Sequence, residues 1–371
     1  MAIINRTNPA EAQPQLTRWL AAKLPGADAV EVSNVVVPKS NGLSAETIMF
    51  DAAWTEYGKR RSERFAVRLE PPAGEGAYCT YDIPGEFAVM QALSNTPVPV
   101  PSVRWLETDE SILGGRFFVM ARLDGRVPPD DPPFTVDGWV LELSERDRAR
   151  LSENGLKALA QVHEVDWRAL GLDFLDRRQD GAPGVEQRLA YYARYFEFAA
   201  RGEANPMVEA GFEWLRQNRP PEPDRPSLLW GDSRTGNMVF ADDLSVAGLL
   251  DWEMVSVGAP EMDLGWWLAT QRLFTEALGV PLPAGIADRE RTIALYEEYS
   301  RRRVKNIHYY EVLGALEVSV MLHRVGAMMI SGGRLPADSP IKLNNQGTQV
   351  LASLLGLPAL QGRPESYIGK R

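Results

Sequence analysis

The stretch SLLWGDSRTGNMVFADDLSVAGLLDWEMVSVGAPEMDL, residues 227–264, decides the fold of this chain. Its first apolar residues, LLW, predict a short buried strand that ends at Gly231 and Asp232. The segments MVF and VAGLL, which the turn residues ADDLS join, predict a β-hairpin. The second hairpin strand ends at Asp251, so we expect the hairpin to return Asp251 toward Asp232 and Asn237.

These three side chains form an oxygen-rich set of two carboxylates and one amide. Such ligands suit Mg²⁺, which keeps several waters and takes one or two carboxylates together with substrate phosphates. Asp232 and Asn237 have the D-x-x-x-x-N interval that separates the base from a metal-binding asparagine in protein-kinase catalytic loops. Asp251 follows where kinases place a metal-binding aspartate. A single aspartate in a turn is more often structural than catalytic, but the compound pattern favours a kinase-like site.

The segment resembles the aminoglycoside-phosphotransferase and choline-kinase-like family, whose catalytic loop usually reads HGD-x-x-x-x-N, followed by a hydrophobic strand and D-[WF]-[ED]. It looks closest to a bacterial branch similar to the kinase-like domains fused to acyl-CoA dehydrogenases, where GD-x-R-x-GN and LDWE-x-x-x-x-G-x-P-x-x-DL are usual. This sequence has GDSRTGN and LDWEMVSVGAPEMDL. The resemblance implies a protein-kinase-like fold.

The pattern along the rest of the chain agrees with an α+β fold of two lobes. Strand-like segments dominate the first third, where ERFAVRLE at 63–70 alternates apolar and polar residues as a half-buried strand does. From about residue 140 onward the pattern is mostly helical. We therefore expect a β-rich, nucleotide-binding lobe over residues 1–122 and an α-rich, catalytic and acceptor-binding lobe over residues 123–371.

The resemblance also implies nucleotide-binding residues in the first lobe. The loop SNGLSA would cover ATP phosphates through its backbone and hydroxyl groups, with Asn41, Gly42 and Ser44 as candidates. Arg68 stands where a typical kinase has the lysine that holds the α- and β-phosphates, and Glu86 is its candidate partner. The alternative for Arg68 and Glu86 is a surface ion pair of little energetic value.

The segment FFVMARLDGR looks like the hinge between the lobes. The resemblance implies that backbone groups of Met120 and Arg122 face the adenine edge of the nucleotide. Both assignments depend on the family likeness rather than on the residue types.

Two residues depart from the family's usual catalytic loop. Trp230 replaces the histidine before Gly-Asp and is expected to supply packing. Arg234, two residues after the expected base Asp232, can neutralise charge on the transferring phosphoryl group or bind an anionic part of the substrate. Asp263 is expected to bind backbone amides of the loop as structural support.

These features predict a phosphotransferase that uses ATP and Mg²⁺ and acts on a hydroxyl group of a small molecule. Asp232 would accept the proton of the hydroxyl, Arg234 would assist, and Asn237 and Asp251 would hold the metal. The acceptor stays open: a hydroxyacyl compound or another hydroxylated metabolite is at least as plausible as an aminoglycoside. The alternative is a non-catalytic, nucleotide-binding regulatory module of the same fold.

Composition narrows the range of partners and compartments. The net charge of −10 disfavours nonspecific nucleic-acid binding, which needs a basic face. The single cysteine, Cys79, permits neither an internal disulfide nor a cysteine-based zinc site. We find no signal peptide and no uninterrupted apolar run long enough to span a bilayer, and therefore expect a cytoplasmic protein without a membrane partner. The oligomeric state is left open.

Overall fold

The computed structural model describes residues 6–38, 44–223, 225–362, 364–366 and 368–369. Its N-terminal part holds a five-stranded sheet of order β1-β2-β3-β5-β4, with every neighbouring pair antiparallel. The strands of this sheet are β1 (Ala27–Val36), β2 (Glu46–Glu56), β3 (Lys59–Leu69), β4 (Val103–Glu107) and β5 (Phe117–Ala121).

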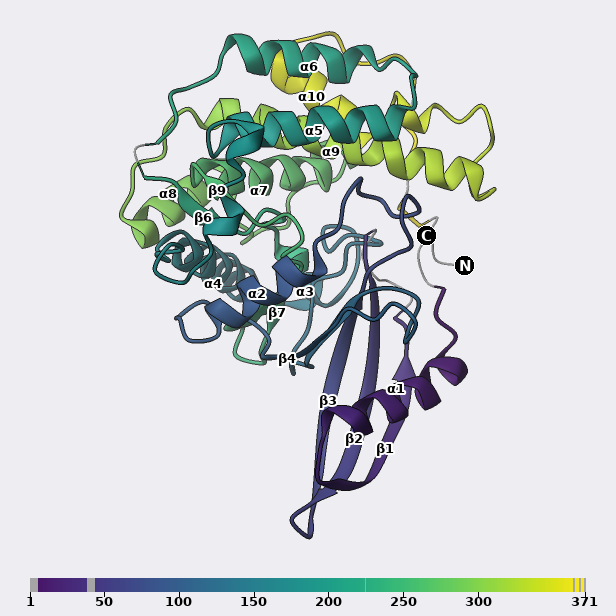
Figure 1. The fold of residues 1–371 in the computed structure, drawn as a ribbon. Coiled ribbons are helices and arrows are strands. Elements are labelled where there is room, and N and C mark those ends of the chain that lie inside the picture. The colour runs from purple at the N-terminus through teal and green to yellow at the C-terminus, as the bar shows by residue number, and fades with distance from the viewer. Residues whose placement is uncertain (1–5, 39–43, 224, 363, 367, 370–371) are drawn as a thin grey trace.

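Helices account for most of the remaining chain, and Figure 1 shows them stacked above the sheet-containing lobe. The α-helices are α1 (Pro9–Lys23), α2 (Ile83–Leu93), α3 (Trp139–Glu142), α4 (Glu145–His163), α5 (Val185–Ala200), α6 (Pro206–Gln217), α7 (Glu261–Leu273), α8 (Arg289–Ser300), α9 (Ile307–Ser331) and α10 (Gln346–Leu355). Short 3-10 turns occur at η1 (Asp173–Leu175), η2 (Arg178–Asp180), η3 (Thr235–Asn237), η4 (Glu276–Leu278) and η5 (Pro340–Lys342).

Two small antiparallel pairs carry the segment that decides the fold. Strand β6 (Ser227–Leu229) pairs with β9 (Ser256–Gly258), and β7 (Met238–Phe240) pairs with β8 (Val246–Leu249). The second pair is the predicted hairpin. The architecture is therefore the predicted α+β arrangement, with a β-rich N-terminal lobe and an α-rich C-terminal lobe.

Strand β3 differs from the half-buried strand that its alternation predicts. Residues 65–69 are buried on both faces. Phe65 and Val67 belong to a core beneath α1, whereas Arg68, on the other face, is only 7% exposed. The prediction of a solvent-facing side was wrong here because the second lobe covers that face with carboxylates, described below.

The connection between β3 and α2, residues 70–82, is called the strap below. It leaves the end of β3, runs up to the helical lobe and returns to α2, as the dark blue trace in Figure 1 shows. Ala77 and Tyr78 of the strap belong to the core cluster that α5 and α9 build. The N-terminal lobe thus contributes side chains to the interior of the C-terminal lobe.

Helix α9 forms the centre of the helical lobe. By its length and composition it is apolar enough to cross a membrane. However, 78% of its most apolar stretch is buried inside the protein, and the helix carries buried charged residues such as Glu317 and Arg324. We therefore assign α9 as a core helix.

Candidate active site

The backbone at the end of β6 turns sharply to present Asp232. Gly231 has φ = +93°, and a Cβ at this position would lie 2.3 Å from the carbonyl oxygen of Met254. Only glycine fits this turn, because both the conformation and the close approach exclude a side chain. Trp230, immediately before, is fully buried, and its indole Nε1 donates to the Leu250 carbonyl at 2.8 Å. The expected packing role of Trp230 is confirmed.

The turn is held from below by the carboxylate of Asp263, at the start of α7. Its two oxygens accept hydrogen bonds from the Trp230 and Gly231 backbone amides, at 2.7 and 2.9 Å. His163, at the end of α4, lies 3.0 Å from the same carboxylate and 2.7 Å from the Tyr296 hydroxyl. The predicted support by Asp263 is confirmed, and it extends through His163 to α8.

Asp232 is buried, with 6% of its surface exposed, and its carboxylate is held in one orientation. Its Oδ1 accepts hydrogen bonds from Trp266 Nε1 at 2.8 Å and from Arg234 Nε at 2.9 Å. Burial raises the pKa of Asp232, the Arg234 cation opposes this, and the negative charge of Asp251 raises it further. A buried carboxylate with a raised pKa, oriented by two donors, is a suitable proton acceptor.

Arg234 lies between several acceptors rather than free in the cleft. Besides Asp232, its guanidinium forms an ion pair with Asp130, and Nη2 donates to Asn237 Oδ1 at 3.0 Å. Gly236 leaves the room for this pair, because a Cβ there would lie 2.3 Å from Asp130 Oδ1. Asn237 in turn donates from Nδ2 to the Asp232 carbonyl at 3.0 Å. Hydrogen bonds among Asp232, Arg234 and Asn237 therefore hold the catalytic loop in one conformation.

A second charged cluster surrounds Arg68 where the two lobes meet. Its Nη2 donates to Asp251 Oδ1 at 2.5 Å and to Glu253 Oε2 at 2.8 Å, and its Nε lies 3.5 Å from Glu86 Oε2. Ser44 Oγ also accepts from Arg68 Nη2, at 3.3 Å. The pair of Arg68 and Glu86 is thus buried, which rules out the alternative of a surface ion pair.

Three carboxylates against one guanidinium leave this cluster with excess negative charge. Burial lowers the pKa of Arg68, but Asp251, Glu253 and Glu86 outweigh that effect and leave the pKa raised. Burial raises the pKa of Glu86 to about 7, although Arg68 lowers it. Burial and the neighbouring Asp251 raise the pKa of Glu253 well above its usual range. Such shifts show that the cluster would be stabilised by additional positive charge.

The donor set therefore fits a divalent cation that is held together with phosphates. Within the described residues no group of three or more His, Cys, Asp or Glu side chains is arranged to hold a metal alone. Mg²⁺ sites commonly have this character, because the substrate phosphates and waters supply the other ligands. Asp251 has the left-handed backbone angle φ = +62°, which aspartate tolerates better than most residues and which is common at functional sites. Asn237 would have to release Arg234 before its Oδ1 could bind a metal.

The remaining predicted nucleotide residues lie in or beside the five-stranded sheet or outside the described residues. Asn41 and Gly42 fall outside the described residues, and Ser44 is their buried neighbour. Met120 pairs with Ala66 in the sheet. The Arg122 amide donates to the Arg64 carbonyl at 2.9 Å, so it is not available to an adenine edge in this arrangement. Their roles stay predictions.

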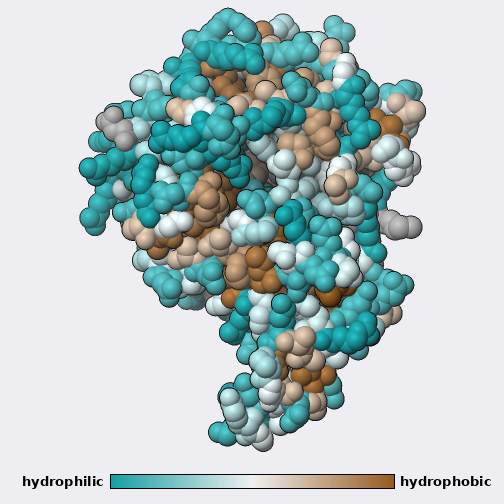
Figure 2. All heavy atoms as spheres, in the orientation of Figure 1, coloured by the Kyte–Doolittle hydropathy of each residue, from teal (hydrophilic) through white to brown (hydrophobic). Residues whose placement is uncertain are grey.

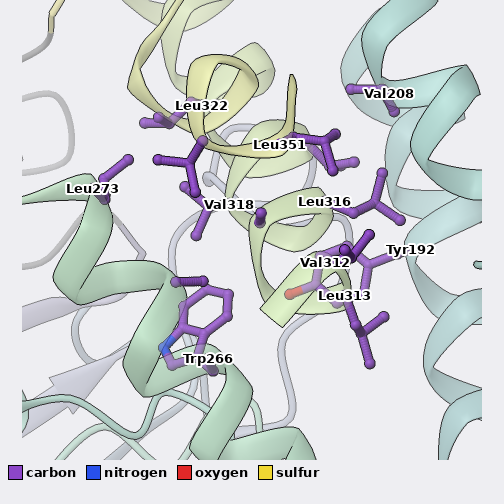
Figure 3. Close-up of a cluster of buried hydrophobic side chains, with 14 of the residues drawn as sticks. Tyr192, Val208, Trp266, Leu273, Val312, Leu313, Leu316, Val318, Leu322 and Leu351 are labelled. Carbon is purple, nitrogen blue, oxygen red and sulfur yellow. The ribbon is translucent and has the colours of Figure 1, made fainter. Parts of the chain in front are cut away.

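A pocket opens next to Asp232 and joins the two charged clusters. Its lining combines the polar residues Ser44, Asp130, Asp232, Arg234, Asp251, Glu253 and Thr270 with the aromatic and apolar residues Tyr78, Trp266, Leu273, Phe274, Val318 and Met321. Figure 3 shows three of these lining residues, Trp266 and Leu273 of α7 and Val318 of α9, within a cluster of buried hydrophobic side chains. In Figure 2, polar residues cover most of the visible surface, and hydrophobic residues gather in patches near the junction of the lobes.

The structure brings Asp232, Arg234 and Asn237 together directly, and it places Asp251 in the same pocket through the hairpin. Reasoning from the sequence missed three contributors to the site: Asp130, Tyr78 and the role of Glu253. Glu253 carried a signal, because it lies in the quoted motif LDWE. Asp130 and Tyr78 carried none, since they lie in loops far from the motif along the chain.

Comparison with known proteins supplies an independent finding. The model of a family described as the phosphotransferase enzyme family matches residues 48–304. Among curated proteins, acyl-CoA dehydrogenase family member 10 of Mus musculus is 28% identical over 301 residues, which cover 77% of this chain. The chain spans only 27% of the length of that relative.

Solved structures share the fold. A protein assigned as an aminoglycoside phosphotransferase from Ralstonia eutropha JMP134 superposes with a TM-score of 0.64 at 23% identity, covering 92% of this chain and 95% of that one. A thermostable aminoglycoside phosphotransferase, APH(4)-Ia, solved with AMP-PNP and hygromycin B, has a TM-score of 0.55 at 11% identity and covers 92% and 98%. These likenesses confirm the predicted kinase-like fold.

Proposed function

Since the chain belongs to the phosphotransferase enzyme family, we propose that it transfers the γ-phosphoryl group of ATP to a hydroxyl group of a small molecule. The observation that carries this proposal is the oriented carboxylate of Asp232, buried beside a pocket that also contains Asp251. Catalysis of phosphoryl transfer depends mainly on positioning the reactants and neutralising their charge. Rigidly held, charged side chains supply both.

Each charged cluster then has a distinct task. Asp232 would orient the acceptor hydroxyl and accept its proton. Arg234 would place positive charge beside the reacting oxygen atoms. Arg68, held by Glu86, would contact the nucleotide phosphates, and Asp251 with Asn237 would hold Mg²⁺, which when bound neutralises phosphate charge. The related APH(4)-Ia was solved with the ATP analogue AMP-PNP, which supports ATP as the donor.

The pocket favours an acceptor with an apolar body. Leu273, Phe274 and Met321 of its lining offer apolar surface to the body of such an acceptor. Hygromycin B is the ligand named for APH(4)-Ia, but the wall described here is less suited to a highly polar sugar. We propose a hydroxyacyl compound or another hydroxylated metabolite with an apolar part.

A screen of hydroxyl compounds tests the proposal. Purified protein with ATP and Mg²⁺ is incubated with alcohols, hydroxy acids, hydroxy esters and aminoglycosides, and products are detected by phosphorus NMR. Phosphorylation of at least one compound is expected, and Asp232→Asn should lower kcat by roughly 10²–10⁴ while nucleotide affinity is preserved. Nucleotide binding without any acceptor phosphorylation would favour the regulatory module instead.

A further inference from the structure

The strap, residues 70–82, is fixed to the helical lobe by backbone contacts. Arg324 of α9 donates from Nη2 to the Gly76 carbonyl at 3.0 Å, and the Tyr195 hydroxyl of α5 donates to the Ala77 carbonyl at 2.7 Å. Arg324 and Tyr195 are both buried. A connection of the N-terminal lobe is therefore anchored as part of the C-terminal lobe.

These anchors place the Tyr78 side chain in the wall of the pocket. Tyr78 is only 7% exposed, and its ring centroid lies 5.5 Å from that of Tyr195. It lines the same pocket as Asp232, together with Trp266 and Met321. The acceptor pocket is thus completed by a residue from the lobe that does not carry the catalytic loop.

The Tyr78 hydroxyl is a buried donor with weak partners. Among the described residues its contacts are the sulfur atoms of Met254 at 3.5 Å and Met321 at 3.6 Å. Thioether sulfur is a poor acceptor, so the hydroxyl makes no strong hydrogen bond there. A buried donor left in this condition costs free energy, which a ligand oxygen would recover.

The electrostatic surroundings indicate what kind of oxygen would bind. Burial, followed by the negative charges of Glu253 and Asp232, raises the pKa of Tyr78 well above its usual range. The hydroxyl therefore stays protonated and remains a donor. The same two carboxylates would repel an anionic oxygen at this position.

We propose that Tyr78 is a specificity-determining residue of the acceptor site, whose hydroxyl donates a hydrogen bond to an uncharged oxygen in the apolar part of the acceptor. An ether or carbonyl oxygen has the required chemistry. This inference rests on the proposed phosphotransferase function and adds that an acceptor with a second, neutral oxygen is preferred over an otherwise equal alcohol without one.

The test compares three alcohols of equal chain length: n-heptanol, which has no second oxygen, and butoxyethanol and propoxypropanol, which carry an ether oxygen at different positions. Initial rates with ATP and Mg²⁺ give kcat/KM for each alcohol. For the unmodified protein we expect at least one ether to exceed n-heptanol by about 3- to 10-fold. In Tyr78→Phe, which retains the ring, this ratio should fall close to one.

Tyr309→Phe is the matched control. It removes a buried hydroxyl that donates to the Leu215 carbonyl, away from the strap and the pocket lining, so the ether preference should persist. Circular dichroism and thermal unfolding verify that both variants fold. A preference that survives in Tyr78→Phe, or that disappears equally in Tyr309→Phe, overturns the role of Tyr78. An unmodified protein that phosphorylates none of the three alcohols contradicts this inference, and the broader screen then decides separately on the phosphotransferase function.

Discussion

Arg234 is surrounded by acceptors, unlike a cation that waits free beside a phosphate. Asp130 pairs with one end of its guanidinium and Asp232 with Nε. These contacts hold the guanidinium next to the Asp232 carboxylate. Arg234 therefore orients Asp232 and lowers its pKa. Two roles are considered for Arg234: neutralising the phosphoryl group or binding an anionic acceptor. The first would change kcat, whereas the second would change the KM of anionic acceptors.

We predict that Arg234→Ala lowers kcat for every acceptor, by roughly 10²–10³, with less change in acceptor KM. Because Arg234 lowers the pKa of Asp232, its removal should also move the acid limb of the kcat profile to higher pH. Steady-state kinetics with one neutral and one anionic acceptor, measured across pH, provides the check. A KM defect confined to the anionic acceptor, with unchanged kcat, would show acceptor binding instead.

Asp251 is the residue whose environment most directly implies a cation. We predict that Asp251→Asn weakens ATP binding when Mg²⁺ is present and changes it little in its absence, as calorimetry can measure. Asp242→Asn, at an exposed position in the hairpin turn of the same segment, is the control and should bind as the unmodified protein does. An equal dependence on Mg²⁺ in the unmodified protein and in Asp251→Asn would reject Asp251 as a metal ligand.

At the scale of elements, α5 and α9 are joined by a buried ion pair. Arg188 Nε lies 3.3 Å from Glu317 Oε1, and both side chains are more than nine-tenths buried. Burial raises the pKa of Glu317 to about 7, although Arg188 lowers it. The folded protein therefore binds this proton more tightly than the unfolded chain, whose glutamate has a pKa near 4.5.

The contribution of Glu317 to the free energy of unfolding should consequently decrease as pH rises from about 4.5 to about 7, because its ionisation is costlier in the folded state. Relative to Glu317→Gln, which does not titrate, the unmodified protein should lose up to about 3 kcal/mol over this window. Urea unfolding of both proteins at several pH values measures the difference. A difference that is constant between these pH values would contradict the raised pKa.

The elements also show what a sequence can predict. The hairpin of β7 and β8, with Asp251 at its end, was predictable because its pattern is local and the spacing is set by strand geometry. The ion pair of Arg234 with Asp130, which are 104 positions apart, was not, since no periodicity links a loop residue to a distant motif. The same holds for His163 and Asp263, 100 positions apart. The alternation of β3 likewise did not indicate that both faces of the strand are buried in the folded protein. One face packs in the apolar core, and on the other Arg68 is paired with carboxylates.

At the scale of the whole molecule, the two lobes share their interiors. One core cluster combines Val89 and Phe118 from the N-terminal lobe with Trp230 and Leu264 from the C-terminal lobe. Another contains Tyr78 of the strap among residues of α5 and α9. The boundary predicted at residue 122 stays a prediction.

We predict that the lobes unfold together. Separation would expose apolar surface that is buried in both clusters, so neither lobe should be stable alone. Calorimetry should show one transition, and a fragment of residues 1–122 should aggregate or stay unfolded, whereas a fragment with an independent core would be soluble. Two resolved transitions, or a folded fragment by circular dichroism, would contradict this expectation.

The anchoring of the strap has a consequence for the order of events during synthesis on the ribosome. Residues 70–82 emerge early, but the groups that fix them come much later: Tyr195 lies 118 positions beyond Ala77, and Arg324 lies 248 positions beyond Gly76. A nascent chain can pair its first strands at once. However, the hydrogen bonds from Arg324 to the strap cannot form until α9 has left the exit tunnel. Ala77 and Tyr78 of the strap stay without their packing partners from α9 for that interval, which makes the half-made chain a natural client for molecular chaperones.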